Sequence, residues 1–215
     1  MTGQPRVGVI SGLVVAALCI VYAAVLAVGL IALPSPDQAI QNPWFTVMEI
    51  LILAIAPAMV GLTVGLYGWA NADHKPLAML SLVFMSMCAA VTCCVHFAVL
   101  TLSRHPVFAG SEWATLVFSF RWPSVAYALE ILAWDFFFPL AALFAALAVR
   151  GSGRARLVRA LLYGSAALAF IGLAGIPLAN MNIRNFGIIG YVVLFPIAAV
   201  LLAFMFRRPE AQSAA

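Results

Sequence analysis

Six long apolar runs constrain this chain more than any other feature of its sequence. They cover residues 7–33, 44–70, 77–102, 123–149, 157–178 and 186–206. Each has at least the roughly 20 residues that an α-helix needs to cross the hydrocarbon core of a bilayer. None shows the alternation of polar and apolar residues that a membrane β-barrel requires. The sequence therefore predicts an all-α fold, in which residues 1–215 form a single domain of six transmembrane helices.

Composition and loop lengths support a polytopic membrane protein. Only 8% of the residues are charged, whereas soluble proteins carry about 25%. The first run is nearly twice as long as the core of a signal peptide, about 7 to 15 residues, so we expect a retained helix. Residues 103–122 are predicted to form an outer interfacial loop with a short aromatic-rich helix near 111–120, and residues 209–215 a flexible tail.

The distribution of positive charge predicts the orientation. Lys and Arg beside membrane helices are retained on the cytoplasmic side. One side of the predicted bundle carries eight of these residues and the other side three: Arg6, Lys75, Arg150, Arg154, Arg156, Arg159, Arg207 and Arg208, against Arg104, Arg121 and Arg184. Both termini are therefore expected in the cytoplasm. The arginines at 150–156 favour anionic lipid headgroups over nucleic acid as their partner, and the Ala-rich composition favours a bacterial inner membrane.

Four ionisable residues lie within the apolar runs: Glu49, His96, Glu130 and Asp135. Such residues cost about 2.5 to 3.5 kcal/mol on insertion and indicate functional sites. At a rise of about 1.5 Å per residue, Glu49, His96 and Glu130 lie roughly 7 to 11 Å below the outer helix ends. Asp135 lies about 18 Å deep, where so short a side chain cannot reach water. We therefore expect Asp135 to face the interior of the bundle.

The fourth run carries the most informative pattern. Tyr127, Glu130 and Trp134 follow the i, i+3, i+7 spacing of one helix face. Asp135 lies about 140° around the helix from Glu130, which argues against a tight carboxylate pair. On the third run, His96 belongs to a face of small and polar residues, so it is predicted to point at Glu49 or Glu130.

The acids and His96 admit three interpretations. They could form a structural hydrogen-bond network between helices, a site that binds a ligand or handles protons, or a metal site built from histidine and carboxylates. We predict no metal. Arg184, in the polar turn 180–185, is predicted either to orient an anionic head group or to pair with Glu49 or Glu130. The alternative is that this turn is simply capped and solvated.

The second, fourth and sixth runs each contain a proline within the apolar stretch: Pro57, Pro139 and Pro196. Proline removes one backbone hydrogen bond and kinks a membrane helix. The shared position suggests three repeated helical hairpins, a device found in transporters. Unrelated prolines within the membrane are the alternative, since such residues are tolerated there.

No phosphate-binding loop, zincin motif, nucleophile elbow or dinucleotide fingerprint occurs, so we expect no cofactor. The leading hypothesis is a site in the outer half that binds a small amphipathic or lipid-like ligand, because acids beside an aromatic wall suit a cationic or amphipathic molecule. Its predicted residues are Glu49, His96, Tyr127, Glu130, Trp134, Asp135 and Arg184. The alternatives are an intramembrane enzyme with His96 and Glu130 as acid and base, a proton-coupled transporter working as a homo-oligomer, and a structural subunit.

Overall fold

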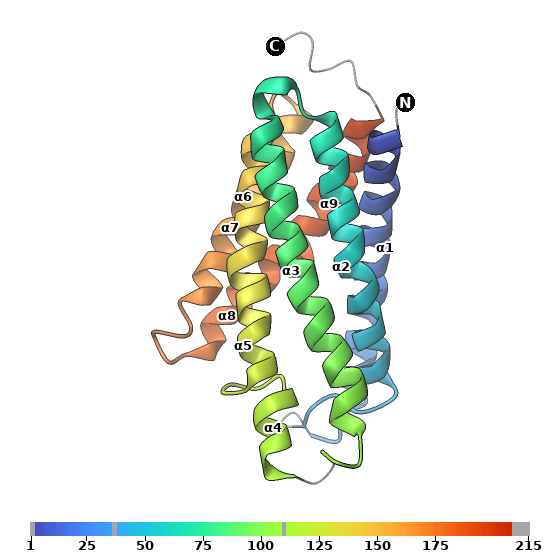
Figure 1. Ribbon diagram of the computed structural model, residues 1–215, viewed down its shortest axis with the longest axis vertical. Helices are drawn as coiled ribbons and strands as arrows, with labels where there is room; N and C mark the ends of the chain where they lie inside the picture. Colours follow the sequence, from blue (N-terminus) through green and yellow to red (C-terminus); the bar gives the residue numbers. More distant parts are fainter. Residues whose placement is uncertain (1–2, 36–37, 109–110, 208–215) are drawn as a thin grey trace.

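The computed structural model describes residues 3–35, 38–108 and 111–207, and all regular structure among them is helical (Figure 1). The first three spans are α1 (Gly3–Ile31), α2 (Trp44–Trp69) and α3 (Lys75–Thr101), with 3-10 helices η1 (Ala72–His74) and η2 (Leu102–Arg104) flanking α3. The short helix α4 (Glu112–Phe118) follows. Residues 209–215, predicted as a tail, lie outside the described residues.

The last three spans include two interruptions. The fourth consists of α5 (Val125–Ile131), the π-helix η3 (Leu132–Phe137) and α6 (Phe138–Ala148), and the fifth is α7 (Arg154–Leu173). The sixth consists of η4 (Met181–Ile183), α8 (Arg184–Ile189), the π-helix η5 (Gly190–Leu194) and α9 (Phe195–Phe206). Six helices of the described chain are long and apolar enough to cross a membrane, which confirms the predicted all-α, six-span architecture.

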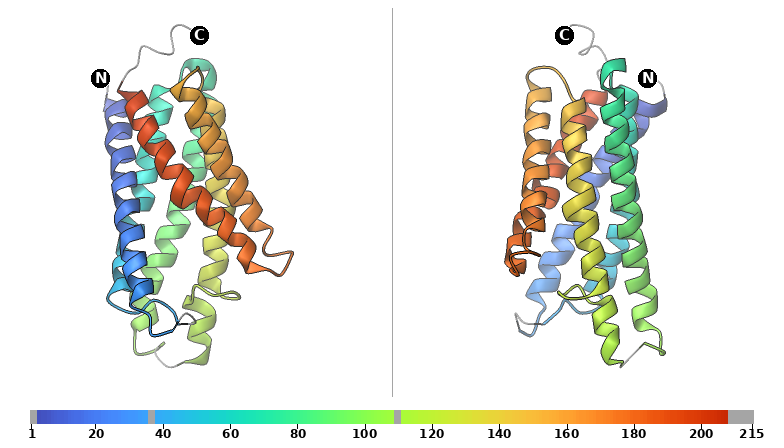
Figure 2. Two further views of the ribbon diagram at one scale, coloured as in Figure 1. Left: turned by 180° about the vertical axis from the view of Figure 1, so that it is seen from behind. Right: turned by 60° about the vertical axis from the view of Figure 1, so that its left-hand side comes forward.

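The helices form one bundle with two different ends (Figure 1). α1 begins and α9 ends at what we call the terminal end, whereas α4 lies at the opposite, distal end. α1 packs on α2 and α9, α3 packs on α2 and α6, and α7 packs on α6, α8 and α9. Viewed from behind, α9 and α8 run diagonally, so that α8 stands apart from α1 toward the distal end (Figure 2).

The fifth and sixth spans differ from their predicted bounds. α7 ends at Leu173 and not at residue 178, because the backbone turns at Gly175 and because Pro177 has no N–H to continue the helix. The sixth span begins earlier than residue 186, so Arg184 lies in the first turn of α8. Its side chain is buried, which excludes the predicted solvated turn at this position.

The three prolines act differently. Pro139 and Pro196 each follow a π-helix directly and lie in the first turn of the next α-helix, so the backbone hydrogen-bond pattern changes where the proline N–H is missing. Pro57 instead lies inside the continuous helix α2. The three spans therefore do not share one kind of interruption, as the predicted threefold repeat would require. The fourth and sixth spans have a π-helix before the proline, and the second span does not.

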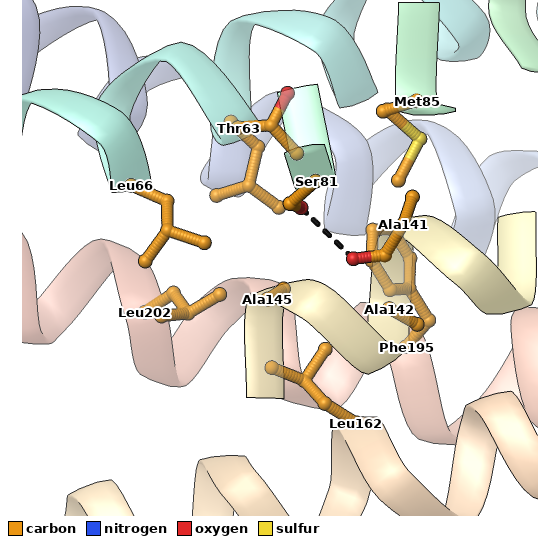
Figure 3. Close-up of a pocket in the computed structure, with 11 residues that line it drawn as sticks. Thr63, Leu66, Ser81, Met85, Ala141, Ala142, Ala145, Leu162, Phe195 and Leu202 are labelled. Carbon is orange, nitrogen blue, oxygen red and sulfur yellow. Dashed lines mark hydrogen bonds between the residues drawn. The ribbon is translucent and has the colours of Figure 1, made fainter. Parts of the chain in front are cut away.

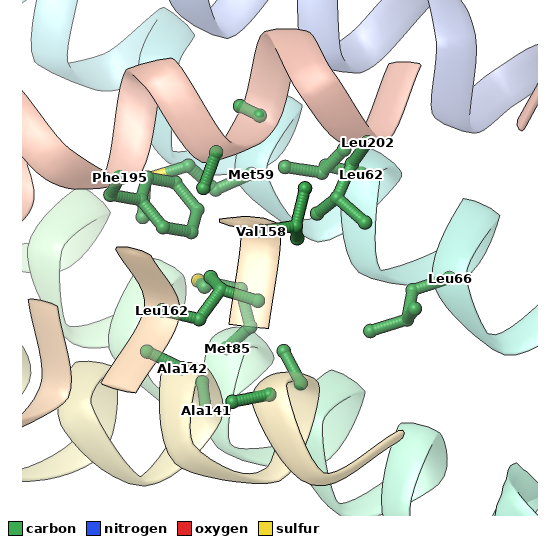
Figure 4. Close-up of a cluster of buried hydrophobic side chains, with 14 of the residues drawn as sticks. Met59, Leu62, Leu66, Met85, Ala141, Ala142, Val158, Leu162, Phe195 and Leu202 are labelled. Carbon is green, nitrogen blue, oxygen red and sulfur yellow. The ribbon is translucent and has the colours of Figure 1, made fainter. Parts of the chain in front are cut away.

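The terminal half of the bundle is closely packed (Figures 3 and 4). Its core contains fully or almost fully buried aliphatic and aromatic side chains: Met59, Leu62, Leu66, Met85, Val158, Leu162, Phe195 and Leu202. Ala141 and Ala142 are buried and let α6 approach α3, where Ser81 Oγ donates to the Ala141 carbonyl at 2.9 Å (Figure 3). The void among these residues measures about 10 Å³, close to the minimum that one water needs.

Glycines bring α1 and α2 into backbone contact. A Cβ on Gly65 would lie 2.2 Å from the Cα of Gly8, and a Cβ on Gly61 would overlap the side chain of Ser11. Gly8 with Gly12, and Gly61 with Gly65, are GxxxG pairs on the two facing helices. This crossing is close to the terminal end and fixes α1 there, so it helps to hold the terminal half closed.

Candidate functional site

His96 is held between two glutamates from neighbouring helices. Its Nδ1 lies 2.8 Å from Glu49 Oε2 on α2, a normal hydrogen-bond distance. Its Nε2 lies 3.4 Å from Glu130 Oε1 on α5. All three residues are buried. The structure thus brings together the three ionisable groups that were expected at one depth, and His96 faces both predicted partners.

The two contacts of His96 are not equivalent. The 3.4 Å separation from Glu130 exceeds the 2.7 to 3.2 Å typical of N–H···O bonds. Neither His96 Nε2 nor Glu130 Oε1 has a hydrogen-bond partner among the described residues, although both atoms are buried. Buried polar atoms without partners are rare because they lose the hydrogen bonds that water would provide. Glu49 therefore anchors the imidazole ring, whereas the Glu130 carboxylate is near it but unattached.

Asp135 forms a separate ion pair with Arg184. Asp135 Oδ2 accepts from Arg184 Nε at 2.8 Å, and Asp135 is fully buried. The Arg184 guanidinium carbon also lies 4.4 Å from the centre of the Tyr127 ring. The hypothesis that Arg184 pairs with Glu49 or Glu130 is therefore wrong. α8 begins at Arg184, which places this side chain inside the bundle next to η3.

The π-helix η3 explains how one span presents both acids to the interior. A π-helix has more residues per turn than an α-helix, so it rotates less per residue. Glu130 precedes η3 and Asp135 lies within it, so they are separated by less than the 140° expected for a regular helix. They still do not form a pair, as predicted, because Asp135 binds Arg184. Gly172 and Gly187 leave room for the second carboxylate oxygen of Asp135.

A cavity of about 830 Å³ occupies the distal half of the bundle. Six of the seven predicted site residues line it, and these are Glu49, His96, Tyr127, Glu130, Trp134 and Arg184. The seventh, Asp135, lies behind the wall and contributes by holding Arg184. The remaining lining comes from α1, α2, α8, η5 and the distal loops, so the cavity lies where α1 and α8 diverge (Figure 2).

Aromatic side chains close the cavity toward the terminal half. Trp134 in η3 and Tyr191 in η5 lie 5.0 Å apart between ring centroids, and both line the cavity. Phe138 contacts both rings and also packs on Phe195, with centroids 5.1 Å apart. We call these four residues the aromatic floor. Sequence analysis missed Tyr191, although it precedes Pro196 by the same five residues that separate Trp134 from Pro139.

The segment after α4 covers the distal side of the cavity. Phe120 stacks on the His96 ring with centroids 5.2 Å apart, and Phe118, Ser119 and Arg121 also line the cavity. The predicted short helix is present as α4, and the chain leaving it contacts the site directly. Phe120 is therefore a further residue of the candidate site. The sequence predicted an aromatic-rich loop in this region but did not single out Phe120.

The lining on the distal side of the cavity is polar and basic. Arg104 Nη2 donates to Asn42 Oδ1 at 3.1 Å and to Thr46 Oγ1 at 2.6 Å, so the guanidinium lies one turn above Glu49 on α2. Gln38, Gln41 and Arg121 line the same region. From the distal side to the floor, the lining therefore changes from basic and amide groups, through carboxylates and histidine, to apolar and aromatic side chains.

The site does not have the donor geometry of a metal centre. In the described part of the chain, no three His, Cys, Asp or Glu side chains are grouped so that they could hold a metal ion. The position of His96 accounts for this absence, because its two ring nitrogens contact two different carboxylates, Glu49 and Glu130, on opposite sides of the ring. Metal ligands must instead converge on one point.

Comparisons of this chain with protein-family models, with curated proteins and with solved structures found no match.

Proposed function

We propose that this protein binds a small amphipathic, lipid-like ligand in the distal cavity. The observation that carries the proposal is the position of the Glu49, His96 and Glu130 cluster on the wall of an 830 Å³ cavity whose floor is aromatic. Ligand sites commonly measure about 300 to 1,000 Å³ and combine an apolar lining with a few polar groups. An amphipathic molecule satisfies both parts, with its polar end at the cluster and its apolar end on the aromatic floor.

The divergence of α1 and α8 supports a route from the bilayer. α1 packs on α2 and α9, whereas α8 packs on α7 and η5, so the two helices separate toward the distal end (Figure 2). Ile188 on α8 lines the cavity and is 40% exposed, so it belongs to both the cavity wall and the apolar exterior. A lipid-like ligand would enter between these helices without crossing an aqueous phase.

We also propose an orientation, with the terminal end in the cytoplasm and the cavity in the outer half of a cell membrane. The terminal end carries Arg6, Lys75, Arg150, Arg154, Arg156, Arg159 and Arg207 among the described residues, whereas the distal end carries Arg104, Arg121 and the buried Arg184. The positive-inside rule favours this orientation. The Ala-rich, Arg-rich composition favours a bacterial inner membrane.

Photocrosslinking tests the proposed binding. The protein in lipid nanodiscs would be irradiated with single-chain probes that carry a diazirine near the chain end and an amine, alcohol or carboxylate head. At least one probe should label the floor segments η3 and η5. Ile52→Trp should reduce this labelling because Ile52 lines the cavity. Ile50→Trp is the matched control, since Ile50 is on the same helix but faces outward with 53% exposure.

Two results would contradict the proposal. One is labelling that is spread evenly over the outward faces of the helices for every probe. The other is floor labelling that Ile52→Trp and Ile50→Trp change equally, since only the first side chain lines the cavity.

An intramembrane enzyme is the second candidate, and the order of the cluster favours it. Glu49 holds His96 through Nδ1 and leaves Nε2 beside Glu130, an arrangement in which one carboxylate orients an imidazole that exchanges a proton on its other side. Catalysis would require both His96 and Glu130 to contact the reacting group. Chemical conversion of a cavity-bound lipid, lost in His96→Gln while crosslinking persists, would distinguish an enzyme from a binding protein.

A further inference from the structure

The cluster around His96 contains more negative charge than its surroundings balance. Glu49 and Glu130 both contact this one imidazole, so even a doubly protonated His96 leaves one carboxylate uncompensated. In the ion pairs of the described residues, His96 is the cationic partner of both glutamates. Arg184 is engaged by Asp135, and Arg104 is held by Asn42 and Thr46. An unbalanced carboxylate in an apolar interior is strongly disfavoured unless a cation or a proton joins it.

The unpartnered atoms show which hydrogen-bonding groups are missing. Glu49 accepts from His96 Nδ1, so in the neutral ring Nε2 carries a lone pair and is an acceptor. Glu130 Oε1 is also an acceptor, and neither atom has a hydrogen-bond partner among the described residues. Both atoms belong to residues that line the cavity and that are more than nine-tenths buried. With a neutral His96, the site therefore lacks a donor for two adjacent acceptors as well as a positive charge. With a doubly protonated ring, it still lacks a second positive charge for the two carboxylates.

We infer that the polar end of the bound ligand is a primary ammonium group that binds Glu130 and His96. This inference rests on the proposed function, because it specifies the head group of the same ligand. A primary ammonium group supplies a positive charge and three N–H donors on one atom. The head group meets the Glu130 carboxylate and His96 Nε2 together, and its alkyl chain lies against Trp134 and Tyr191 on the aromatic floor.

Other head groups satisfy the site less well. An alcohol offers one donor and no charge, and a carboxylate adds to the negative charge. A quaternary ammonium ion has the charge but no N–H, and it is bound through open aromatic faces. Two of the aromatic rings next to the acids each have one face covered, since Phe120 stacks on His96 and Arg184 lies over Tyr127.

Glu130 is the group that changes partner on binding. Glu130 Oε1 and His96 Nε2 lie 3.4 Å apart, and both atoms are buried. No hydrogen bond to a described residue holds the Glu130 carboxylate, whereas Glu49 fixes the histidine. The carboxylate therefore turns toward the cavity to receive the ammonium group while the imidazole keeps its position.

The test compares four compounds that share one alkyl chain: dodecylamine, dodecyltrimethylammonium, dodecanol and dodecanoate. Each is titrated against the protein in phosphatidylcholine nanodiscs, and the thermal unfolding temperature is followed by tryptophan fluorescence. Dodecylamine should raise that temperature more than the other three compounds. Glu130→Gln should weaken the apparent affinity for dodecylamine by about ten- to a hundredfold, as expected for one charged hydrogen bond.

Two further variants complete the design. Glu112→Gln is the matched control, because Glu112 is an exposed acid on α4 outside the cavity and should leave the dodecylamine response unchanged. Glu130→Asp keeps the charge but shortens the side chain, and it should bind dodecylamine with intermediate affinity. If Glu130→Gln does not fold, Glu130→Asp still tests whether the Glu130 side chain binds the ammonium group.

Equal stabilisation by dodecyltrimethylammonium would overturn the inference, because that ion has no N–H to donate. Stabilisation by dodecanol or dodecanoate but not by dodecylamine would overturn it as well, and the proposed amphipath binding would stand. If no compound binds and no probe labels the floor, the proposed function itself fails.

Discussion

Glu49 and Glu130 contact the same imidazole ring under different constraints. Glu49 makes a 2.8 Å hydrogen bond to His96, whereas Glu130 lies 3.4 Å away without one. A hydrogen bond to a charged group contributes more to stability than one between neutral groups. An unpaired buried carboxylate, in contrast, destabilises the fold that contains it.

Glu49→Gln should therefore lower the free energy of unfolding by about 1 kcal/mol, the difference between a charged and a neutral hydrogen bond. Glu130→Gln should leave stability unchanged or raise it, because it removes an uncompensated charge. Chemical or thermal unfolding in detergent measures both. Equal losses for the two variants would instead indicate a purely structural network, as a structural membrane subunit would have.

The Asp135 and Arg184 pair is a structural element of the cavity wall. Arg184→Met would leave the fully buried Asp135 without its cation and should destabilise the protein by about 3 to 5 kcal/mol. Adding Asp135→Asn should restore a large part of this loss. Arg156→Gln, an exposed arginine on α7, should change stability by less than about 0.5 kcal/mol. Independent, additive effects at 135 and 184 would show that the two side chains do not interact.

At the scale of helices, hydropathy predicted the spans but not their interruptions. Length and apolar composition identify a spanning helix without reference to its neighbours, so six spans could be recognised. The π-helices η3 and η5 each precede a proline, but Pro57 lies in α2 without such an interruption, so proline alone does not specify them. Trp134, Phe138 and Tyr191 pack together across the two interrupted spans, and the sequence does not show this contact. The same packing sets the pairing of Asp135 with Arg184, which is why the sequence suggested a different partner for this arginine.

The α1 and α2 crossing gives a prediction at this scale. Gly65→Ala should destabilise the protein by about 1 to 3 kcal/mol, because the new methyl group would meet the Gly8 backbone, which cannot move aside. Gly164→Ala is the control, since its Cβ would meet the flexible end of Leu194 at 3.2 Å, and alanine favours the helix. Thermal unfolding in detergent compares the two. A tolerated Gly65→Ala would mean that the helices are not in backbone contact.

At the scale of the whole molecule, the two halves of the bundle differ in packing. The terminal half has small residues at its helix contacts and a void of about 10 Å³, whereas the distal half contains an open cavity of about 830 Å³. The sequence located the ionisable cluster in one half from its helix depths alone. It could not predict the cavity, because the volume results from the diagonal course of α8 and α9 (Figure 2).

The proposed orientation is tested by cysteine labelling in intact cells with a membrane-impermeant maleimide. Thr115→Cys on α4 should react from outside, whereas Ser152→Cys, in the loop between α6 and α7, should react only after the cells are opened. Both positions are exposed, and the native cysteines lie within the spans. The reverse pattern would place the terminal end outside and contradict the orientation inferred from the charge distribution.

Under the proposed function, the diagonal course of α8 and α9 would also determine which lipids can reach the protein's interior. Because α8 stands away from α1 only toward the distal end, the proposed route between them would open to one monolayer of a bilayer and not to the other (Figure 2). Exchange with the cavity would therefore follow the composition of that leaflet alone. The proposed binding protein would thus distinguish the two leaflets of a membrane by its architecture, even when both contain the same lipid at different concentrations.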